Sequence, residues 1–334
     1  MQEVLNLIGY DIGGTKIGIG VGNSAGKIFA KARLDNKDTD PAVILPELVE
    51  LTKKLLAEAN LTIADITAFG ISSPSPADIL NGIIVAPPNN PRWRNVPIRQ
   101  YLSDELGIEG FFENDANCGM LAEWFFGAGR GAQDVIYLTM STGIGGGIVA
   151  AGHLLHGRNR TAGEVGHVVI EDSGRQCNCG LKGCYEAYCG GRAIAQRMQE
   201  ELADIPDAAV VRFAGGKLED VDLVALEKAV RAGDEYACNL WDEMCRRNAQ
   251  AIGGMINTFN PERIILGTIA WAAGDLFMDP LKKYLPNYAW KELYESCELV
   301  PSELRRDIGY YAGIAGALNG LYEAGRYELP WLKK

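Results

Sequence analysis

The sequence predicts an α/β protein with two domains that repeat one plan. Its 334 residues are enough for two well-buried cores. Two glycine-rich turns of similar design, DIGGTK at residues 11–16 and STGIGG at residues 141–146, each follow an apolar strand. Helical and strand patterns alternate between these turns and after the second, which is typical of α/β architectures. We therefore expect a duplicated fold in which each half carries one turn.

The individual elements follow from the spacing of apolar residues. Alternation bounded by glycines predicts strands, and apolar residues three and four positions apart predict helices. In the first half these patterns give three strands over residues 5–34, a helix over 42–59, a strand over 66–72, a Pro- and Asn-rich loop over 72–97, a short helix, a strand over 108–115 and a helix over 116–128. In the second half they give strands on both sides of the second turn, helices over 223–232 and 234–258, a strand over 263–267 and a final helix over 308–324.

The composition argues against several classes of partner. The formal charge is -11 and the pI is about 4.9, so the summed field repels nucleic acid and anionic membranes. No apolar run approaches the roughly 20 residues that span a bilayer, and the N-terminus lacks the pattern of a signal peptide. We expect a cytoplasmic protein that binds small molecules, with no nucleic-acid or membrane partner.

Three of the eight cysteines are clustered in the stretch RQCNCGLKGCYEA at residues 175–187. In a reducing compartment such a cluster is more typical of metal ligands than of disulfides. Cys177, Cys179 and Cys184 supply three thiolates, and His167 supplies a fourth ligand, which is the set of a structural zinc site. The alternative is a group of free thiols, because the CxC start departs from the usual CxxC. The other five cysteines are interpreted as isolated, buried thiols.

Either glycine-rich turn can hold phosphate, since backbone N–H groups without a neighbouring Cβ can converge on an anion. In the first turn Thr15 adds a hydroxyl donor, Lys16 adds a positive charge, and Asp11 can hold a metal-bound water. The alternative is a plain tight turn. Neither turn matches GxxxxGK[ST] or GxGxxG, so a P-loop or a dinucleotide-binding fold is not supported.

The stretch FFENDAN at residues 111–117 places carboxylates at the end of an expected strand, where a helix begins. Asn114 and Asp115 can be helix caps, because both residue types bond free N–H groups at a helix start. They can also be functional. Asp115 would then accept the proton of a hydroxyl nucleophile during phosphoryl transfer, and Asn114 would orient the substrate.

Taken in order, DIGGTK, ENDAN, STGIGGG, AGEVGH and CNCGLKGCYEA resemble the ROK family of bacterial sugar kinases and repressors, within the actin-like ATPase superfamily. The resemblance covers nearly the whole chain. It implies a two-domain actin-like (ribonuclease H-like) fold with an interdomain cleft. The smaller domain would comprise residues 1–116 plus about 308–334, and the larger one residues 117–307 with the zinc-binding loop.

The resemblance also implies ATP-dependent, Mg²⁺-assisted phosphorylation of a hexose hydroxyl, with zinc as a structural ion that shapes the sugar pocket. Asp115 corresponds to the catalytic base. The residues implied to contact the sugar are Ser75, Asn89, Asn114, Glu164, His167 and Glu186. The residues implied to surround the nucleotide phosphates are Gly13, Gly14, Thr15, Lys16, Thr142 and Gly143, with Asp11 near Mg²⁺.

Two departures from the family pattern bear on specificity. Ser75 in SSPSPAD replaces a glycine of the sugar-side loop. In LGTIAW only Gly267 remains of the adenosine-side glycines, and the bulkier Thr268 and Ile269 are expected to narrow the nucleotide seat. The substrate is therefore open among related hexoses, and polyphosphate or another nucleoside triphosphate is an alternative donor.

We expect a kinase of the 6-hydroxyl of a hexose, with glucose as the leading acceptor. The alternatives are N-acetylmannosamine, N-acetylglucosamine, and a sugar sensor of this family without catalysis. Retention of Asp115 and of both glycine turns favours the enzyme. Repressors of the family carry an N-terminal helix-turn-helix, for which the early first strand leaves no room. The resemblance favours a homodimer or homotetramer.

Overall fold

The chain divides into two compact units, and each unit combines segments that are distant in sequence. The structure, a computed structural model, describes residues 3–37, 39–87, 90–329 and 331–332. The first unit comprises residues 1–133, 147–162 and 303–334, and the second comprises residues 134–146 and 163–302. The boundary expected after residue 116 therefore differs from the division by contacts, because helix α3 (Asp115–Phe126) packs on α12 (Ile308–Glu323) within the first unit.

The first unit contains a five-stranded sheet of order β3-β2-β1-β4-β7. The helices and strands of this unit, in chain order, are β1 (Asn6–Ile12), β2 (Lys16–Asn23), β3 (Ile28–Asp35), α1 (Pro41–Glu58), β4 (Ala68–Ser73), β5 (Ala77–Asp78), β6 (Ile83–Ile84), α2 (Ile98–Leu106), β7 (Gly110–Asn114), α3 and α12. Strands β1, β2 and β3 are antiparallel neighbours, whereas β1, β4 and β7 are parallel. The parallel strands therefore end at one edge of the sheet, where β7 delivers Asn114 to the start of α3.

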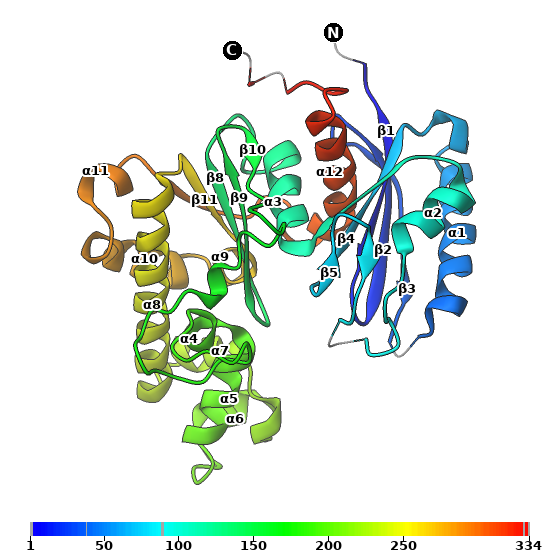
Figure 1. Cartoon of the computed structure of the whole chain (residues 1–334). Coiled ribbons are helices and arrows are strands. Elements are labelled where there is room, and N and C mark those ends of the chain that lie inside the picture. Colours follow the sequence, from blue (N-terminus) through cyan, green and yellow to red (C-terminus); the bar gives the residue numbers. More distant parts are fainter. Residues whose placement is uncertain (1–2, 38, 88–89, 330, 333–334) are drawn as a thin grey trace. The chain divides into compact units, whose positions relative to one another are not determined.

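Helices cover both faces of this sheet (Figure 1). On one face Ile8 and Tyr10 of β1 join a buried apolar core with residues of α1 and α2. Alternation along the strand turns Gly9 to the opposite face. There the backbone of α12 lies directly on the sheet: a Cβ at Gly313 would lie 2.6 Å from the Gly9 Cα and 2.7 Å from the Gly70 carbonyl oxygen. These three glycines are needed for this close approach.

The second sheet has the order β10-β9-β8-β11-β12. Its strands are β8 (Val135–Met140), β9 (Ile144–Ala150), β10 (His153–Leu154), β11 (Arg263–Leu266) and β12 (Glu298–Pro301). The helices of the second unit are α4 (Glu186–Cys189), α5 (Gly191–Glu201), α6 (Ala209–Phe213), α7 (Leu223–Arg231), α8 (Glu235–Phe259), α9 (Thr268–Ala273), α10 (Asp275–Tyr284) and α11 (Lys291–Tyr294). Strands β8, β11 and β12 are parallel.

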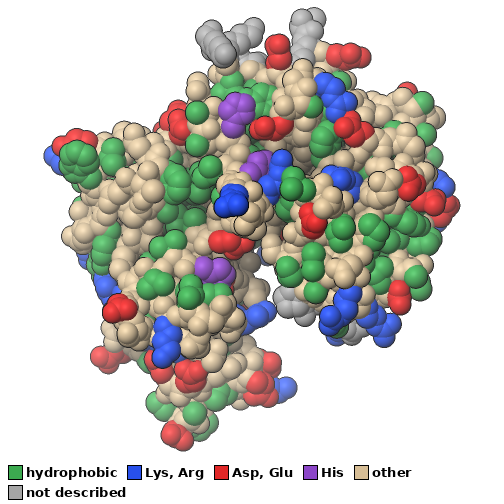
Figure 2. Space-filling view, in the orientation of Figure 1, with side chains coloured by type: hydrophobic (Ala, Val, Ile, Leu, Met, Phe, Trp, Pro, Cys, Tyr) green, Lys and Arg blue, Asp and Glu red, His purple; other side chains and the backbone are tan. Residues whose placement is uncertain are grey.

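Both sheets follow one plan, in which three consecutive strands are followed by two parallel strands reached through helical crossovers. This confirms the duplicated α/β architecture predicted from the sequence. The pattern missed the two-stranded β5-β6 hairpin, which lies inside the stretch interpreted as a loop. Among the described residues, no helix is both long and apolar enough to cross a membrane. Acidic and basic side chains are interspersed over the face shown in Figure 2.

Candidate active site

A cavity of about 240 Å³ in the first unit brings together residues from both motifs of this half. Gly13 and Gly14 of the first glycine turn line it, together with Ser75 and the predicted base Asp115. Asp115 begins α3 and its side chain is exposed. The structure thus places a carboxylate beside a phosphate-type turn, although about a hundred residues separate them in the sequence. The remaining lining residues are Ile12, Asn36, Pro74, Ile84, Pro87, Asn90 and Trp93.

The first glycine turn joins β1 to β2 and is tightly fixed. The Gly13 N–H donates to the Lys16 carbonyl oxygen at 2.9 Å, and a Cβ at Gly13 would lie 2.8 Å from that same oxygen. The buried Asn36 holds the turn from outside: its Nδ2 donates to the Gly13 carbonyl at 2.8 Å, and its N–H donates to the Thr15 carbonyl at 2.8 Å. Thr15 and Lys16 remain exposed. The turn is therefore preformed, with its hydroxyl and ammonium groups accessible to a ligand.

The Asn114 side chain caps α3 and also faces the cavity loop. Its Oδ1 accepts from the N–H groups of Ala116 and Asn117, at 2.9 and 3.3 Å. Its Nδ2 donates to the Ser75 Oγ at 3.1 Å. The capping interpretation of Asn114 is thus confirmed, and the cap itself orients the amide towards Ser75. Asn89 lies outside the described residues.

Three buried polar atoms belong to residues that line this cavity and have no hydrogen-bond partner within the described part of the chain. They are the Oδ1 of Asn36, the Oδ1 of Asn90 and the Nε1 of Trp93, whose residues are 1%, 2% and 1% exposed. Leaving such an atom unpaired costs about 1–3 kcal/mol. Two acceptors and one donor beside one cavity suit a ligand rich in hydroxyl groups. None of the three residues is among the site residues predicted from the sequence, because an unpaired buried atom becomes apparent only in the folded chain.

Asp11 lies at the end of β1, where its Oδ1 accepts a hydrogen bond from the Ser72 Oγ at 2.9 Å. Burial raises the pKa of this carboxyl, while the Ser72 hydrogen bond and the charge of Arg33 oppose the rise. A nearby cation stabilises the ionised form of a carboxyl group that is buried in this way. One carboxylate, together with waters and substrate phosphates, is a common way for proteins to hold Mg²⁺. Asp11 therefore fits the predicted magnesium role.

We expect the substitution Asp11→Asn to raise the melting temperature at pH 7 and to reduce magnesium-dependent activity. The raised folded-state pKa means that ionised Asp11 destabilises the fold at pH values above the ordinary value of 3.8. The gain in melting temperature should therefore shrink as the pH falls towards that value. Thermal unfolding from pH 5 to pH 8 tests this, and an unchanged or lower melting temperature at pH 7 would contradict it.

In the second unit the segment Glu164–His167 and Glu186 both pack on the start of β9. The Glu186 Oε2 accepts from the Ile144 N–H at 2.8 Å, and this carboxylate leaves no room for a side chain at Gly143. Gly166 likewise allows the segment to lie on the Ile144 carbonyl. Glu164 is exposed, whereas His167 is half-buried. Glu186 is thus bonded to the second glycine turn, a link that its predicted sugar role did not include.

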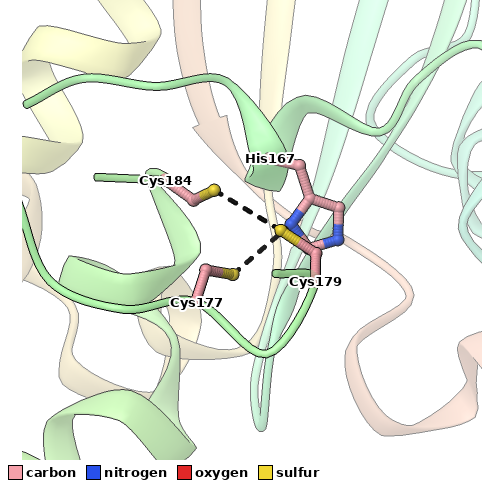
Figure 3. A group of neighbouring side chains, drawn as sticks. All are labelled: His167, Cys177, Cys179 and Cys184. Carbon is pink, nitrogen blue, oxygen red and sulfur yellow. Dashed lines mark hydrogen bonds between the residues drawn. The ribbon is translucent and has the colours of Figure 1, made fainter. Parts of the chain in front are cut away.

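The predicted zinc ligands converge in the second unit (Figure 3). Their ligand atoms all lie within 4.8 Å of one another. His167 Nδ1 lies 3.7 Å from Cys177 Sγ, and the Sγ atoms of Cys179 and Cys184 are 3.6 Å apart. A tetrahedral zinc with Zn–S bonds of about 2.3 Å separates two sulfur ligands by about 3.8 Å. The four residues therefore have the chemistry and spacing of a Cys₃His zinc site.

The loop that carries these cysteines depends on two glycines in the left-handed region. Gly180 has φ of 96° and Gly183 has φ of 79°. A Cβ at Gly183 would also overlap the Glu171 carbonyl. Burial raises the pKa of the Cys184 thiol to about 12, whereas a backbone hydrogen bond from Leu181 lowers that of Cys179. A metal ion would displace the Cys184 proton, so metal binding and loop stability are coupled.

A second cavity, of about 470 Å³, lies wholly within the second unit. Thr142 of the second glycine turn lines it, as do Thr268 and Ile269 at the start of α9. Gly267 precedes α9, and a Cβ there would lie 2.7 Å from the Leu138 carbonyl, which explains why glycine remains at this position. The remaining lining residues are Met140, Ser141, Gly191, Arg192, Ala195, Asp222, Leu223, Val224, Glu227, Trp241, Ala272 and Ala273. This cavity is large and mainly apolar, which suits an adenosine.

Two sheets of one plan, each with a glycine turn between its first two strands, define the actin-like ATPase fold, as predicted. A model of the ROK family matches residues 7–319, so the chain belongs to the ROK family. A glucokinase of Thermotoga maritima is 38% identical over 326 residues, which are 96% of this chain and 98% of that protein. The ROK hexokinase of Thermus thermophilus is 29% identical with a TM-score of 0.83, covering 96% and 100% of the two chains. A ROK family glucokinase from Streptomyces griseus, in complex with glucose and AMPPNP, is 28% identical with a TM-score of 0.73, covering 92% and 97%.

Proposed function

We propose that this protein transfers the γ-phosphoryl group of ATP to the 6-hydroxyl of glucose. The chain is a hexose kinase, as the similar glucokinases and the ROK hexokinase indicate. The observation that carries the proposal is the cavity lined by Asp115, Gly13 and Gly14, where a base and a phosphate turn meet. A carboxylate beside a preformed turn suits a reaction in which a hydroxyl loses its proton to the enzyme and gains a phosphoryl group.

In the proposed mechanism the Asp115 carboxylate accepts the proton of the sugar 6-hydroxyl as the hydroxyl oxygen attacks the γ-phosphorus of ATP. A bond from this oxygen to the phosphorus forms while the bond from the phosphorus to the bridging oxygen breaks, and ADP leaves. Asn114 and Ser75, already bonded to each other, bind sugar hydroxyls beside it. The N–H groups of the first turn and Lys16 stabilise the negative charge that spreads over the transferred group. Positioning and electrostatics supply most of the acceleration, since phosphoryl transfer requires little covalent chemistry from the protein.

We also propose roles for residues of the second unit. Glu164, His167 and Glu186 bind further sugar hydroxyls. In the zinc-bound protein the Nδ1 side of His167, which faces Cys177, would be the metal ligand, leaving an N–H at Nε2 to donate to the sugar. Thr142, Gly143, Gly267 and Thr268 bind the nucleotide, with the adenosine in the 470 Å³ cavity. Mg²⁺ would be held by Asp11 through water and would neutralise phosphate charge.

We expect the substitution Asn90→Leu to raise the KM for glucose about tenfold while changing the free energy of unfolding by less than about 1 kcal/mol. The Oδ1 of Asn90 has no partner among the described residues, and its Nδ2 donates only a long bond of 3.4 Å, to the Asn36 carbonyl. Stability therefore gains little from this amide, whereas a sugar hydroxyl can pair with it. Chemical denaturation and glucose saturation curves measure the two effects. Asn81→Leu, at an exposed position, is the control, and an unchanged KM would remove Asn90 from the sugar site.

A coupled ADP-release assay with Mg-ATP tests the proposed function. Glucose, mannose, fructose, N-acetylglucosamine and N-acetylmannosamine are compared, with Asp115→Ala as the control. A strong, Asp115-dependent signal with glucose supports the proposal, and a stronger signal with an N-acetyl sugar replaces the substrate. If no acceptor gives a signal, polyphosphate is tested as donor. Sugar binding without turnover by either donor would indicate a sensor. A cytoplasmic location and a homodimer or homotetramer stay predictions.

A further inference from the structure

The buried carboxylate of Glu113 lies directly before the proposed catalytic residues and does not line the cavity that contains Asp115. Glu113 is only 6% exposed and lies on β7, one position before the last residue of the strand, Asn114. Its Oε1 accepts from the Asn114 N–H at 2.9 Å and from the Asn117 Nδ2 at 2.9 Å. Glu113 therefore fixes the peptide group between itself and Asn114, and it also bonds a side chain in the first turn of α3.

The other oxygen of Glu113 binds a histidine that is distant in sequence. His156 Nε2 lies 2.7 Å from Glu113 Oε2, and both side chains are largely buried. The Arg160 Nη1 lies 3.4 Å from the same His156 nitrogen, so positive charge stands beside the pair. A buried carboxylate is stable only when hydrogen bonds and charge compensate its lost hydration. His156 supplies the one contact to Oε2 that is recorded in the described residues.

The segment that carries His156 is itself anchored. The adjacent Leu155 N–H donates to the Ile148 carbonyl of β9 at 2.8 Å, and the Ala162 N–H donates to the His156 carbonyl at 3.1 Å. On its other side the pair borders a cavity of about 360 Å³, which Arg99, Asn319 and Glu323 also line. Among the described residues, none lines both this cavity and the one that contains Asp115.

We propose that His156 is a positioning residue for phosphoryl transfer, acting through Glu113. Without its contact to Oε2, the Glu113 carboxylate turns towards other partners and releases the Asn114 N–H and the Asn117 amide. The start of α3 then loosens, and Asp115 loses the fixed geometry that proton transfer requires, because catalysis falls steeply when a base is displaced by about 1 Å. The inference rests on the proposed role of Asp115. His156 belongs to none of the motifs that the sequence contains.

The test is a double-mutant cycle between His156 and Asp115, with activity measured at saturating glucose and ATP. We expect His156→Leu to lower kcat about tenfold or more with the KM for ATP unchanged, and His156→Gln, which keeps a donor, to restore most of it. In an Asp115→Asn background, His156→Leu should have almost no further effect, because the group that it positions is gone. His153→Leu is the matched control, since His153 faces Glu323 at 3.4 Å and not Glu113.

Three outcomes would overturn the proposal. The first is a kcat of His156→Leu within twofold of the unmodified protein. The second is an equal loss of kcat in both backgrounds, which would mean a general structural effect. The third is a His156→Gln variant as impaired as His156→Leu despite an unchanged melting temperature. Failure of the proposed function is distinguishable, because the unmodified protein would then show no Asp115-dependent turnover at all.

Discussion

The substitution Asp115→Asn should lower kcat by about 10²–10⁴, the usual contribution of a positioned general base. Asparagine retains the size of the side chain and an oxygen that can accept from the Ala116 N–H, a bond of 2.8 Å in the structure. The start of α3 should therefore persist, and the melting temperature should change little. The KM for glucose should rise much less than kcat falls, because the lost function concerns the transferred proton. Steady-state kinetics over a range of glucose concentrations measures both.

The control is Asp104→Asn, an exposed aspartate on α2 whose carboxylate accepts from the Gln100 side chain at 2.8 Å. It removes the same charge from the same unit, so any general electrostatic effect appears in both variants. A kcat of Asp115→Asn close to that of the control would refute the base assignment. None of the other predicted site residues that line this cavity would then remain as a proton acceptor.

Loss of the zinc site should have the second large effect. We expect Cys179→Ser to lower the melting temperature by about 10 °C, because loss of a metal site costs several kcal/mol and each kcal/mol shifts the midpoint by about 2–4 °C. The KM for glucose should rise about tenfold, the cost of one substrate hydrogen bond. The KM should respond because two proposed sugar ligands are held by the zinc cluster. His167 is one of its four residues, and Glu186 follows Cys184 by two positions.

Metal analysis of the purified protein gives the reference, with one zinc per chain as the expected content. Cys238→Ser is the matched control, because this partly buried thiol on α8 lies outside the cluster. The zinc assignment would be abandoned if the untreated protein held no metal and if Cys179→Ser behaved like the control in both melting temperature and KM.

The sequence predicted the elements that follow strict patterns. The two glycine turns, the helix over α3 and the Cys₃His set all depend on local spacing, and the structure places each of them as expected. The match of Gly13 and Asp115 to one family also foretold that they share a function. Their common cavity could not be derived from spacing, because it depends on how β1 and β7 are arranged in the sheet.

The residues that the sequence did not reveal are those whose role depends on a distant partner. His156 belongs to no sequence motif. Its proposed role depends on its contact with Glu113, which lies 43 positions earlier. Asn36 likewise carries no motif, yet it holds the first glycine turn through two hydrogen bonds. Such contacts arise only when the strands pair, so no local pattern records them.

The close contact of α12 with the first sheet, made by three glycines, can form only late in protein synthesis. Gly9 and Gly70 leave the ribosome early, but Gly313 follows only after residues 163–302 have been synthesised. The first sheet therefore lacks α12 on one face while residues 163–302, most of the second unit, are synthesised. Contacts between the two ends of a chain close slowly because loop closure costs entropy. The first unit should thus complete its fold only after α12 has been synthesised.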